Sequence, residues 1–241
     1  MHEQLRQDAK GAILFDATVS PQVASPWFDT DHWRGQGALS TQPGGRGGVA
    51  IIHTPAGECV LRHYRRGGLV ARLMGDRYLW TGADRTRSFR EFRLLQAMAK
   101  LALPVPQVVA AQYRRTGLYY QADLITRRIA DVHTLAQSVA QGRLDAELAQ
   151  EVGALVARFH RAGVWHADLN AHNVLISPAG LYLVDFDRGR LRAPAPGWRM
   201  ANLQRLRRSL LKLGAAATGE AVFEQVIWTS LMDGYEETLG A

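Results

Sequence analysis

Cysteine, lysine and long apolar runs are the scarce features of this 241-residue sequence. Its single cysteine, Cys59, excludes an intramolecular disulfide and a metal site built on cysteines. No apolar run approaches the roughly 20 residues that a membrane-spanning helix needs, and residues 1–16 lack the apolar segment of a signal peptide. We therefore expect a cytoplasmic protein, either free or bound to a membrane surface.

The sequence is basic, with 29 Lys plus Arg against 22 Asp plus Glu, yet lysine occurs only as Lys10, Lys100 and Lys212. The excess is therefore carried by arginine, whose guanidinium suits bidentate contacts with phosphates and carboxylates. This composition fits a solvated basic surface, an anionic substrate, an anionic membrane face or nucleic acid. No zinc, RRM-like or helix-turn-helix signature supports the last of these, so we expect no nucleic-acid partner.

Apolar periodicity and turn signals divide the sequence into a sheet-rich first half and a mainly helical second half. The first half has predicted strands at residues 49–53, 58–64, 107–113 and 117–125, and a predicted helix at 87–101. The second half has a predicted helix at 145–161, a hairpin at 174–184, and helices at 200–213 and 219–238. Residues 1–43, with aromatic residues scattered among Pro, Asp and Gly, favour irregular packing against a later element. The prediction is an α+β fold, with an N-lobe at about 1–125, a hinge at about 126–131 and a C-lobe at about 132–241.

Three polar residues stand at fixed spacings around the predicted hairpin. Asp168 precedes Asn173 by five residues, and Asp185 follows Asn173 by twelve, which matches the kinase pattern H-x-D-x-x-x-x-N and its later D-F-x. Phosphoryl transfer needs a carboxylate that orients the acceptor hydroxyl and takes its proton, a role that suits Asp168. Mg²⁺ prefers hard oxygen ligands, which Asn173 and Asp185 supply. We interpret His166 as a structural brace for this loop.

Residues upstream of this motif predict an ATP site. A standard protein kinase has a strand lysine that pairs with a helix glutamate, and none of the three lysines is suitably placed. Arg62 occupies the strand position and Glu91 the helix position. Gly45, Gly47 and Gly48 precede these strands, and glycine-rich turns let backbone N–H groups approach phosphates closely.

Other positions depart from the protein kinases. Asn170 stands where serine/threonine kinases usually have lysine, Asp187 replaces the glycine of D-F-G, and no A-P-E motif follows. The segment between Asp185 and the predicted helix at 200–213 is short, which leaves little room for a peptide-binding segment. The sequence therefore predicts a bilobal protein-kinase-like fold that phosphorylates a small molecule.

Three blocks of sequence resemble a known family. The segments V-L-R-H-Y-R-R-G-G (60–68), H-A-D-L-N-A-H-N-V-L-I (166–176) and V-D-F-D-R-G-R (184–190) are similar to those of the Kdo (3-deoxy-D-manno-octulosonic acid) kinases of the lipopolysaccharide kinase group. The resemblance implies ATP-dependent phosphorylation of the 4-hydroxyl of Kdo in a Kdo–lipid A precursor. It also implies a peripheral position on the cytoplasmic face of the inner membrane, and tolerance of arginine at the position of Arg62.

An anionic amphiphile of this kind suits two basic segments. Arg65, Arg66, Arg72 and Arg77 alternate with apolar residues and are candidate contacts to the Kdo–lipid A precursor or to the anionic inner-membrane surface. Residues 203–212 also alternate arginine with leucine. A membrane-surface helix and an ordinary helix with one buried face both fit this second segment, and the ordinary helix is favoured.

Three other interpretations stay open. A kinase of the same fold could act on heptose, an aminoglycoside or choline, because the ATP and magnesium motifs do not specify the acceptor. The missing strand lysine fits a non-catalytic pseudokinase, although Asp168, Asn173 and Asp185 are all present. The high isoelectric point, about 10.0, motivates a nucleic-acid-binding protein.

Overall fold

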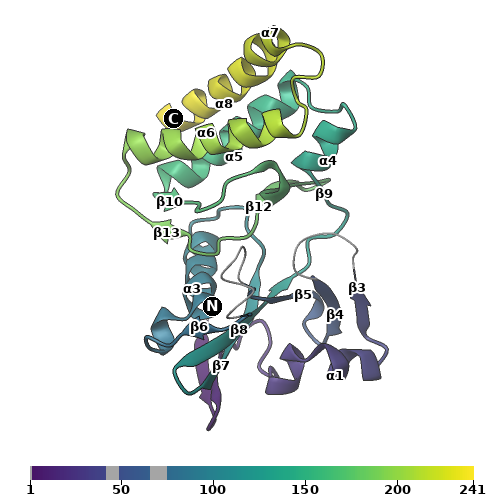
Figure 1. Ribbon diagram of the computed structural model, residues 1–241, viewed down its shortest axis with the longest axis vertical. Coiled ribbons are helices and arrows are strands. Elements are labelled where there is room, and N and C mark those ends of the chain that lie inside the picture. The colour runs from purple at the N-terminus through teal and green to yellow at the C-terminus, as the bar shows by residue number, and fades with distance from the viewer. Residues whose placement is uncertain (1, 42–48, 66–74) are drawn as a thin grey trace. The chain divides into compact units, whose positions relative to one another are not determined.

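The computed structural model describes residues 2–41, 49–65 and 75–241, and in it the chain forms two compact units (Figure 1). The first comprises Met1–Ala97 and Pro106–Arg128, and the second comprises Met98–Val105 and Ile129–Ala241. The expected lobes differ from these units chiefly in residues 98–105, which group with the second unit.

Two hydrogen bonds explain this grouping. The backbone N–H of Leu183 donates to the carbonyl of Pro104 over 3.1 Å. The guanidinium of Arg158 donates to the carbonyl of Ala102, also over 3.1 Å. The turn after the first long helix is therefore bonded to elements of the second unit.

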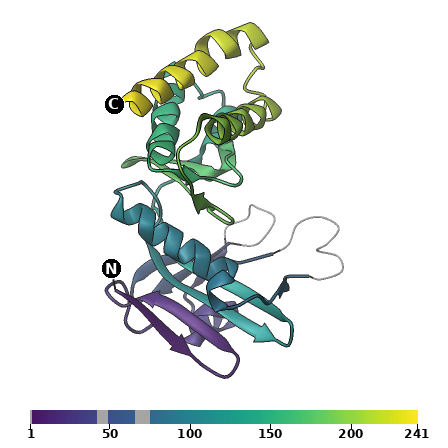
Figure 2. The ribbon, with the colours of Figure 1, turned by 90° about the vertical axis from the view of Figure 1, so that its left-hand side faces the viewer.

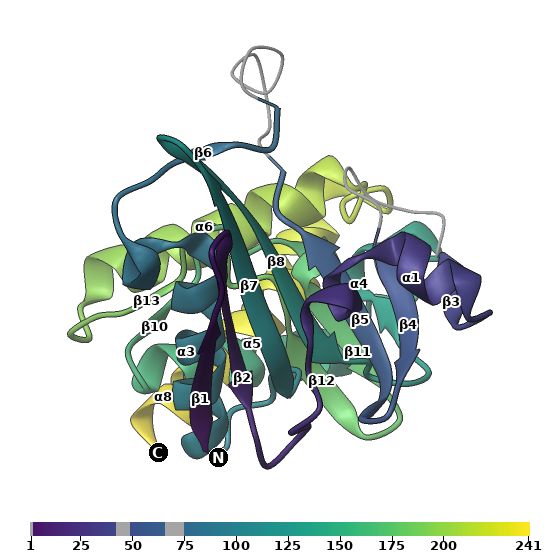
Figure 3. The same ribbon diagram turned by 90° about the horizontal axis from the view of Figure 1, so that it is seen from below.

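An antiparallel sheet is the framework of the first unit, with strand order β1-β2-β7-β8-β5-β4-β3 and with β6 paired to β8 (Figure 3). The strands are β1 (Glu3–Gln7), β2 (Gly11–Asp16), β3 (Leu39–Thr41), β4 (Ala50–Thr54), β5 (Gly57–His63), β6 (Tyr78–Leu79), β7 (Val108–Thr116) and β8 (Tyr119–Arg127). Among the described residues, the helices of this unit are α1 (Thr30–Gly35) and α3 (Arg87–Lys100), together with 3₁₀ turns at Ser25–Phe28 and Ala83–Arg85. The four predicted strands appear as β4, β5, β7 and β8, and the predicted helix appears as α3.

The N-terminal segment is more regular than expected. Residues 1–43 do not pack irregularly throughout, because β1 and β2 form a hairpin and β2 pairs with β7. Every residue of β2 is buried, so its apolar run lacks the alternation that marks a half-exposed strand. The expectation of irregular packing was therefore wrong for this hairpin.

Both faces of the sheet are covered. Adjacent residues of a strand point to opposite faces, and in β5 the side chain of Arg62 reaches Glu91 of α3. Its neighbour Leu61 belongs to a buried cluster with Trp27 and Phe28. Helix α3 therefore lies on one face (Figure 2), and the segment around the Ser25–Phe28 turn covers the other.

Helices dominate the second unit. They are α4 (Leu135–Ala140), α5 (Ala146–Arg161), α6 (Pro196–Lys212), α7 (Glu220–Val222) and α8 (Thr229–Gly240), with a π-helical segment at Phe223–Trp228 between the last two. The strands are β9 (His133–Thr134), β10 (Val164–Trp165), β11 (Val174–Ser177), β12 (Gly180–Leu183) and β13 (Arg190–Leu191), and a 3₁₀ turn lies at Ala171–Asn173. Strands β12, β11 and β9 form one small sheet, and β10 pairs with β13.

The predicted elements of this unit are present, with two changes. Helix α6 begins at Pro196, four residues before the predicted start, because proline is tolerated in the first turn of a helix. The single helix expected at 219–238 is instead interrupted by the π-helical segment. The predicted N-cap of α5 is confirmed, since Asp145 accepts a hydrogen bond from the backbone N–H of Leu148 over 2.9 Å.

Candidate active site

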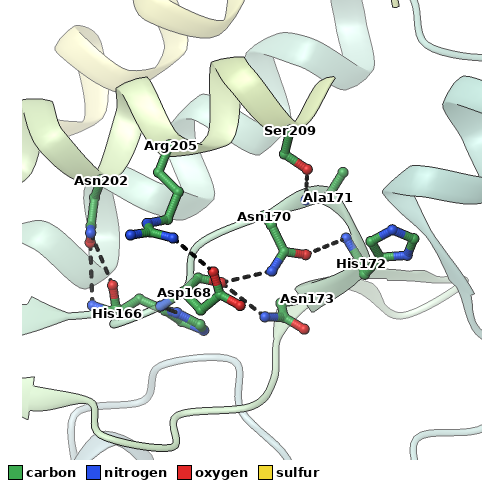
Figure 4. Close-up of polar contacts among 9 residues, drawn as sticks. All are labelled: His166, Asp168, Asn170, Ala171, His172, Asn173, Asn202, Arg205 and Ser209. Carbon is green, nitrogen blue, oxygen red and sulfur yellow. Dashed lines mark hydrogen bonds and ion pairs between the residues drawn. The ribbon is translucent and has the colours of Figure 1, made fainter. Parts of the chain in front are cut away.

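Side-chain-to-backbone hydrogen bonds shape the segment His166–Asn173, called here the catalytic loop (Figure 4). The amides of Asn170 and Asn173 each donate to the carbonyl of Asp168 over 2.9 Å. The side-chain oxygen of Asn170 also accepts from the backbone N–H of His172 and so begins the 3₁₀ turn. The loop is thereby folded around one carbonyl group, and the carboxylate of Asp168 is exposed.

His166 links this loop to the segment that follows the hairpin. Its Nδ1 accepts from the backbone N–H of Asp168 over 3.1 Å, so the ring proton lies on Nε2, which donates to the carbonyl of Val184 over 3.0 Å. Burial lowers the pKa of His166 and favours this neutral form. Phe186 packs against the ring at 4.8 Å between centroids. His166 thus contacts both the loop and the segment after the hairpin, and its role as a structural brace stays a prediction.

Helix α6 presents three polar side chains to the catalytic loop, at intervals of three and four residues (Figure 4). Asn202 is buried, accepts from the backbone N–H of His166 over 3.2 Å and donates to its carbonyl over 2.9 Å. Ser209 accepts from the backbone N–H of Ala171 over 3.1 Å. Between them, Arg205 donates to Oδ1 of Asp168 over 3.0 Å. One face of α6 therefore holds both ends of the loop and its carboxylate.

These three residues were not among the predicted site residues. The signal was present as N-x-x-R-x-x-x-S within a predicted helix, since such spacings lie on one helix face. The remaining face of α6 is ordinary, because Leu203, Leu206 and Leu210 are buried. This burial agrees with the favoured interpretation of residues 203–212.

The β11–β12 hairpin brings the two candidate metal ligands to the same end. Val174 pairs with Leu183, and the backbone N–H of Val184 donates to the carbonyl of Asn173 over 3.0 Å. Asn173 therefore precedes the hairpin directly beside the strand that leads to Asp185. Asp185 has a left-handed backbone with φ of 61°, which is unusual for a residue with a side chain.

The chemistry of these two donors fits a magnesium ion. The Asn173 amide nitrogen is engaged by the Asp168 carbonyl, so the amide oxygen is the atom that remains for a cation. Asp185 adds an exposed carboxylate. Mg²⁺ commonly takes one or two protein oxygens and completes its octahedron with phosphate oxygens and water. The described residues contain no group of three or more His, Cys, Asp or Glu placed to hold a metal.

In the first unit, Arg62 and Glu91 form the predicted ion pair at 2.5 Å. Tyr64, which the sequence prediction missed, donates its hydroxyl to the same Glu91 carboxylate over 2.6 Å. Glu91 is buried, with 3% of its side chain exposed, so its negative charge depends on these partners. The pair joins the end of β5 to the second turn of α3.

The other predicted residues of this unit are only partly described. Gly45, Gly47 and Gly48 lie outside the described residues, within the connection between the paired strands β3 and β4. Arg66 and Arg72 also lie outside them. Arg65 and Arg77 are exposed.

His63, the last residue of β5, joins two carboxylates. Its Nδ1 lies 2.6 Å from Oδ1 of Asp123, and its Nε2 lies 2.8 Å from Oδ2 of Asp76. The hydrogen bond to Asp123 raises the pKa of His63, with Asp76 adding to the effect. The end of β5 is thereby tied to β8 through Asp123.

A sheet-rich first unit and a mainly helical second unit are typical of the protein-kinase-like fold, and solved structures show the same fold. A structure of WaaP in complex with acyl carrier protein matches with a TM-score of 0.50 at 16% identity, covering 90% of this chain and 97% of that one. An aminoglycoside-3'-phosphotransferase of type VIII matches with a TM-score of 0.55 at 15% identity, covering 88% and 93%. The predicted α+β, kinase-like fold is therefore confirmed.

The chain belongs to the lipopolysaccharide kinase (Kdo/WaaP) family, whose model matches residues 30–235. It is 50% identical over 213 residues to a 3-deoxy-D-manno-octulosonic acid kinase from Stenotrophomonas maltophilia (strain R551-3). It is equally similar to one from Xanthomonas campestris pv. campestris (strain B100). Both alignments cover 88% of this chain and 85% of the relative. The predicted family resemblance is confirmed.

Proposed function

We propose that this protein transfers the γ-phosphate of ATP to the 4-hydroxyl of Kdo in a Kdo–lipid A precursor during lipopolysaccharide core synthesis. The observation that carries the proposal is the catalytic loop with an exposed Asp168 carboxylate, in a chain half identical to curated Kdo kinases. Heptose kinases of the same family are the alternative, because these loop contacts do not distinguish one sugar hydroxyl from another.

In this mechanism Asp168 accepts the proton of the acceptor hydroxyl as that oxygen attacks the γ-phosphorus and ADP leaves. Asn173, through its amide oxygen, and Asp185, through its carboxylate, would hold Mg²⁺. When bound, the ion neutralises charge on the nucleotide phosphates. His166 keeps the loop in place through its two ring nitrogens.

The first unit would supply the nucleotide contacts. Arg62 has the guanidinium geometry that binds phosphate oxygens in pairs, and the ion pair with Glu91 orients it. Gly45, Gly47 and Gly48 would let backbone N–H groups approach the phosphates. The two units would then act as the N-lobe and C-lobe of a kinase, with a hinge at about 126–131.

The acceptor carries negative charge on a lipid, which suits the arginines of the first unit. Arg65 and Arg77, both exposed, together with Arg66 and Arg72, would contact the sugar carboxylate, the lipid A phosphates or the anionic membrane surface. No helix among the described residues is long and apolar enough to cross a membrane. We propose a peripheral position on the cytoplasmic side of the inner membrane.

The test is ATP-dependent phosphorylation of purified Kdo–lipid A precursor, with and without Mg²⁺, read by mass spectrometry and by assignment of the phosphorylated hydroxyl. One added phosphate on Kdo that requires Mg²⁺ is the expected result. Phosphorylation of a heptose-bearing acceptor but not of Kdo would replace this substrate with the alternative.

Two variants test the residue roles in the same assay. Asp168→Ala should abolish turnover while nucleotide binding is retained, because its proposed role is toward the acceptor. Asp185→Ala should weaken Mg²⁺-dependent nucleotide binding itself. Near-normal turnover of Asp168→Ala would show that another group takes the hydroxyl proton.

A further inference from the structure

The carboxylate of Asp168 has a cationic partner that comes from outside its own loop. Arg205, on α6, donates from Nη1 to Oδ1 of Asp168 over 3.0 Å (Figure 4). Serine/threonine kinases usually have a lysine two residues after this aspartate, where this chain has Asn170. Asn170 uses its side chain to hold the backbone at Asp168 and His172. The loop therefore has no cation at that position, and α6 provides one.

We propose that Arg205 is a positioning residue that holds one oxygen of Asp168 and thereby directs the other, Oδ2, toward the acceptor hydroxyl. The inference rests on the proposed function, since it assumes that Asp168 takes the hydroxyl proton. Arg205 itself contacts no reacting atom in this role.

The anchoring of α6 supports this role. Asn202 and Ser209, on either side of Arg205 along the helix, are bonded to the backbone at both ends of the catalytic loop. The backbone from which Arg205 extends is therefore held relative to the carboxylate that it contacts. Small displacements of a catalytic group can cost about a hundredfold in rate, so a fixed hydrogen bond to Oδ1 has a direct effect on turnover.

A contribution to folding alone does not account for this pair. The side chains of Arg205 and Asp168 are 47% and 59% exposed, and ion pairs with this exposure contribute little to folding stability. By contrast, Arg207 on the same helix pairs with Glu224 of the π-helical segment, away from the catalytic loop. The value of the Arg205 contact therefore lies in orienting the carboxylate.

The test compares Arg205→Ala and Arg205→Lys with Arg208→Ala in the full-length protein, using detergent-solubilised Kdo–lipid A precursor. Arg208 is a matched control, because it is exposed on α6 and the described residues offer it no ion pair. We expect Arg205→Ala to lower kcat by about tenfold to a hundredfold, with the KM for ATP unchanged within twofold. Arg205→Lys should retain an intermediate kcat, and Arg208→Ala should match the unaltered protein.

Rescue of activity by added guanidinium ion distinguishes a positioning role of Arg205 from a merely structural one, because a structural role predicts no rescue. At concentrations far below those that unfold the protein, it should restore part of the activity of Arg205→Ala, because the missing side chain leaves an exposed space beside Oδ1. It should not raise the activity of Arg208→Ala or of the unaltered protein. If Arg205→Ala loses its native circular dichroism, Arg205→Met is used instead, because its longer stem keeps more of the packing.

The outcomes separate this inference from the proposed function. A kcat for Arg205→Ala within twofold of the unaltered protein overturns the inference, as does a change confined to the KM for ATP, which would place the guanidinium on the nucleotide. If Asp168→Ala is inactive while Arg205→Ala is fully active, only the inference fails. If Asp168→Ala keeps its turnover, the proposed role of Asp168 fails first.

Discussion

The substitution Gly153→Ala should destabilise the protein by separating α5 from α8. A Cβ atom at Gly153 would lie 1.9 Å from the carbonyl oxygen of Leu231 and 2.9 Å from the backbone nitrogen of Tyr235. Gly234 shows the reciprocal contact, where a Cβ would lie 2.1 Å from the carbonyl oxygen of Gln150. The two helices therefore touch backbone to backbone, and the atoms nearest to each added Cβ are carbonyl oxygens that cannot move aside as a flexible side chain would.

The magnitude follows from the overlap. Carbon and carbonyl oxygen atoms approach to about 3.3 Å in close helix contacts, so the helices would have to separate by more than about 1 Å. Overpacking of this kind costs about 1–3 kcal/mol, occasionally more, and the better helix propensity of alanine returns at most about 1 kcal/mol. We expect a net loss in the free energy of unfolding of about 1–2 kcal/mol.

Urea unfolding followed by far-UV circular dichroism measures this loss, and Gly197→Ala is its matched control. Gly197 is also helical, in the first turn of α6, but no atom lies within 4 Å of its added Cβ. The control should therefore be neutral or slightly stabilising. If Gly153→Ala were as stable as Gly197→Ala, α5 and α8 could not be packed as closely as described here.

Three further predictions concern titration and the nucleotide site. Burial lowers the pKa of His160 to about 4, so stability should be full above about pH 6.5, the value for an unfolded histidine, and fall as the pH drops toward 4. Between pH 7 and pH 5 the free energy of unfolding, measured with urea, should fall by about 2 kcal/mol, and His160→Gln should lack this fall. Parallel pH profiles of the two proteins would contradict the lowered pKa of His160. The raised pKa of His63 predicts the opposite window: its contribution is full below about pH 6.5 and is lost as the pH rises through the raised value. The difference in melting temperature between the unaltered protein and His63→Gln should accordingly shrink in alkaline buffer, and a constant difference would argue against a charged His63 between its carboxylates. Glu91→Gln should raise the KM for ATP at least severalfold, because it removes the buried charge that orients Arg62; an unchanged KM, measured by steady-state kinetics, would separate this pair from nucleotide binding.

The parts of the site that were predictable from sequence are those encoded by local spacing. The run from His166 to Asp185 contains the loop, the hairpin and the two candidate ligand positions within twenty residues. Hairpin pairing alone brings Asn173 beside the strand that leads to Asp185. The pairing of Arg62 with Glu91 was also accessible, because both the strand and the helix had clear periodic patterns.

The parts that were missed depend on contacts between distant segments. Strand β1 is exposed along its whole length and β2 is buried along its whole length, so neither strand has the environment that produces alternation in sequence. The contribution of α6 could not be derived either, since Asn202 lies 36 residues from His166 and Arg205 lies 37 residues from Asp168. A polar stripe on one helix face is equally compatible with solvent exposure.

By itself, the sequence determined the class of chemistry and the family to which the chain belongs, and it predicted the loop proposed to carry that chemistry. Only the tertiary structure decided which side chains hold that loop, and that the cation beside Asp168 comes from α6. The physical reason is that periodicity and motif spacing report the local path of the backbone, whereas a hydrogen bond between distant segments depends on how whole helices pack. The close approach of α5 to α8 at Gly153 and Gly234 was also decided by the tertiary structure. A glycine in a helical sequence does not identify which other helix packs against it.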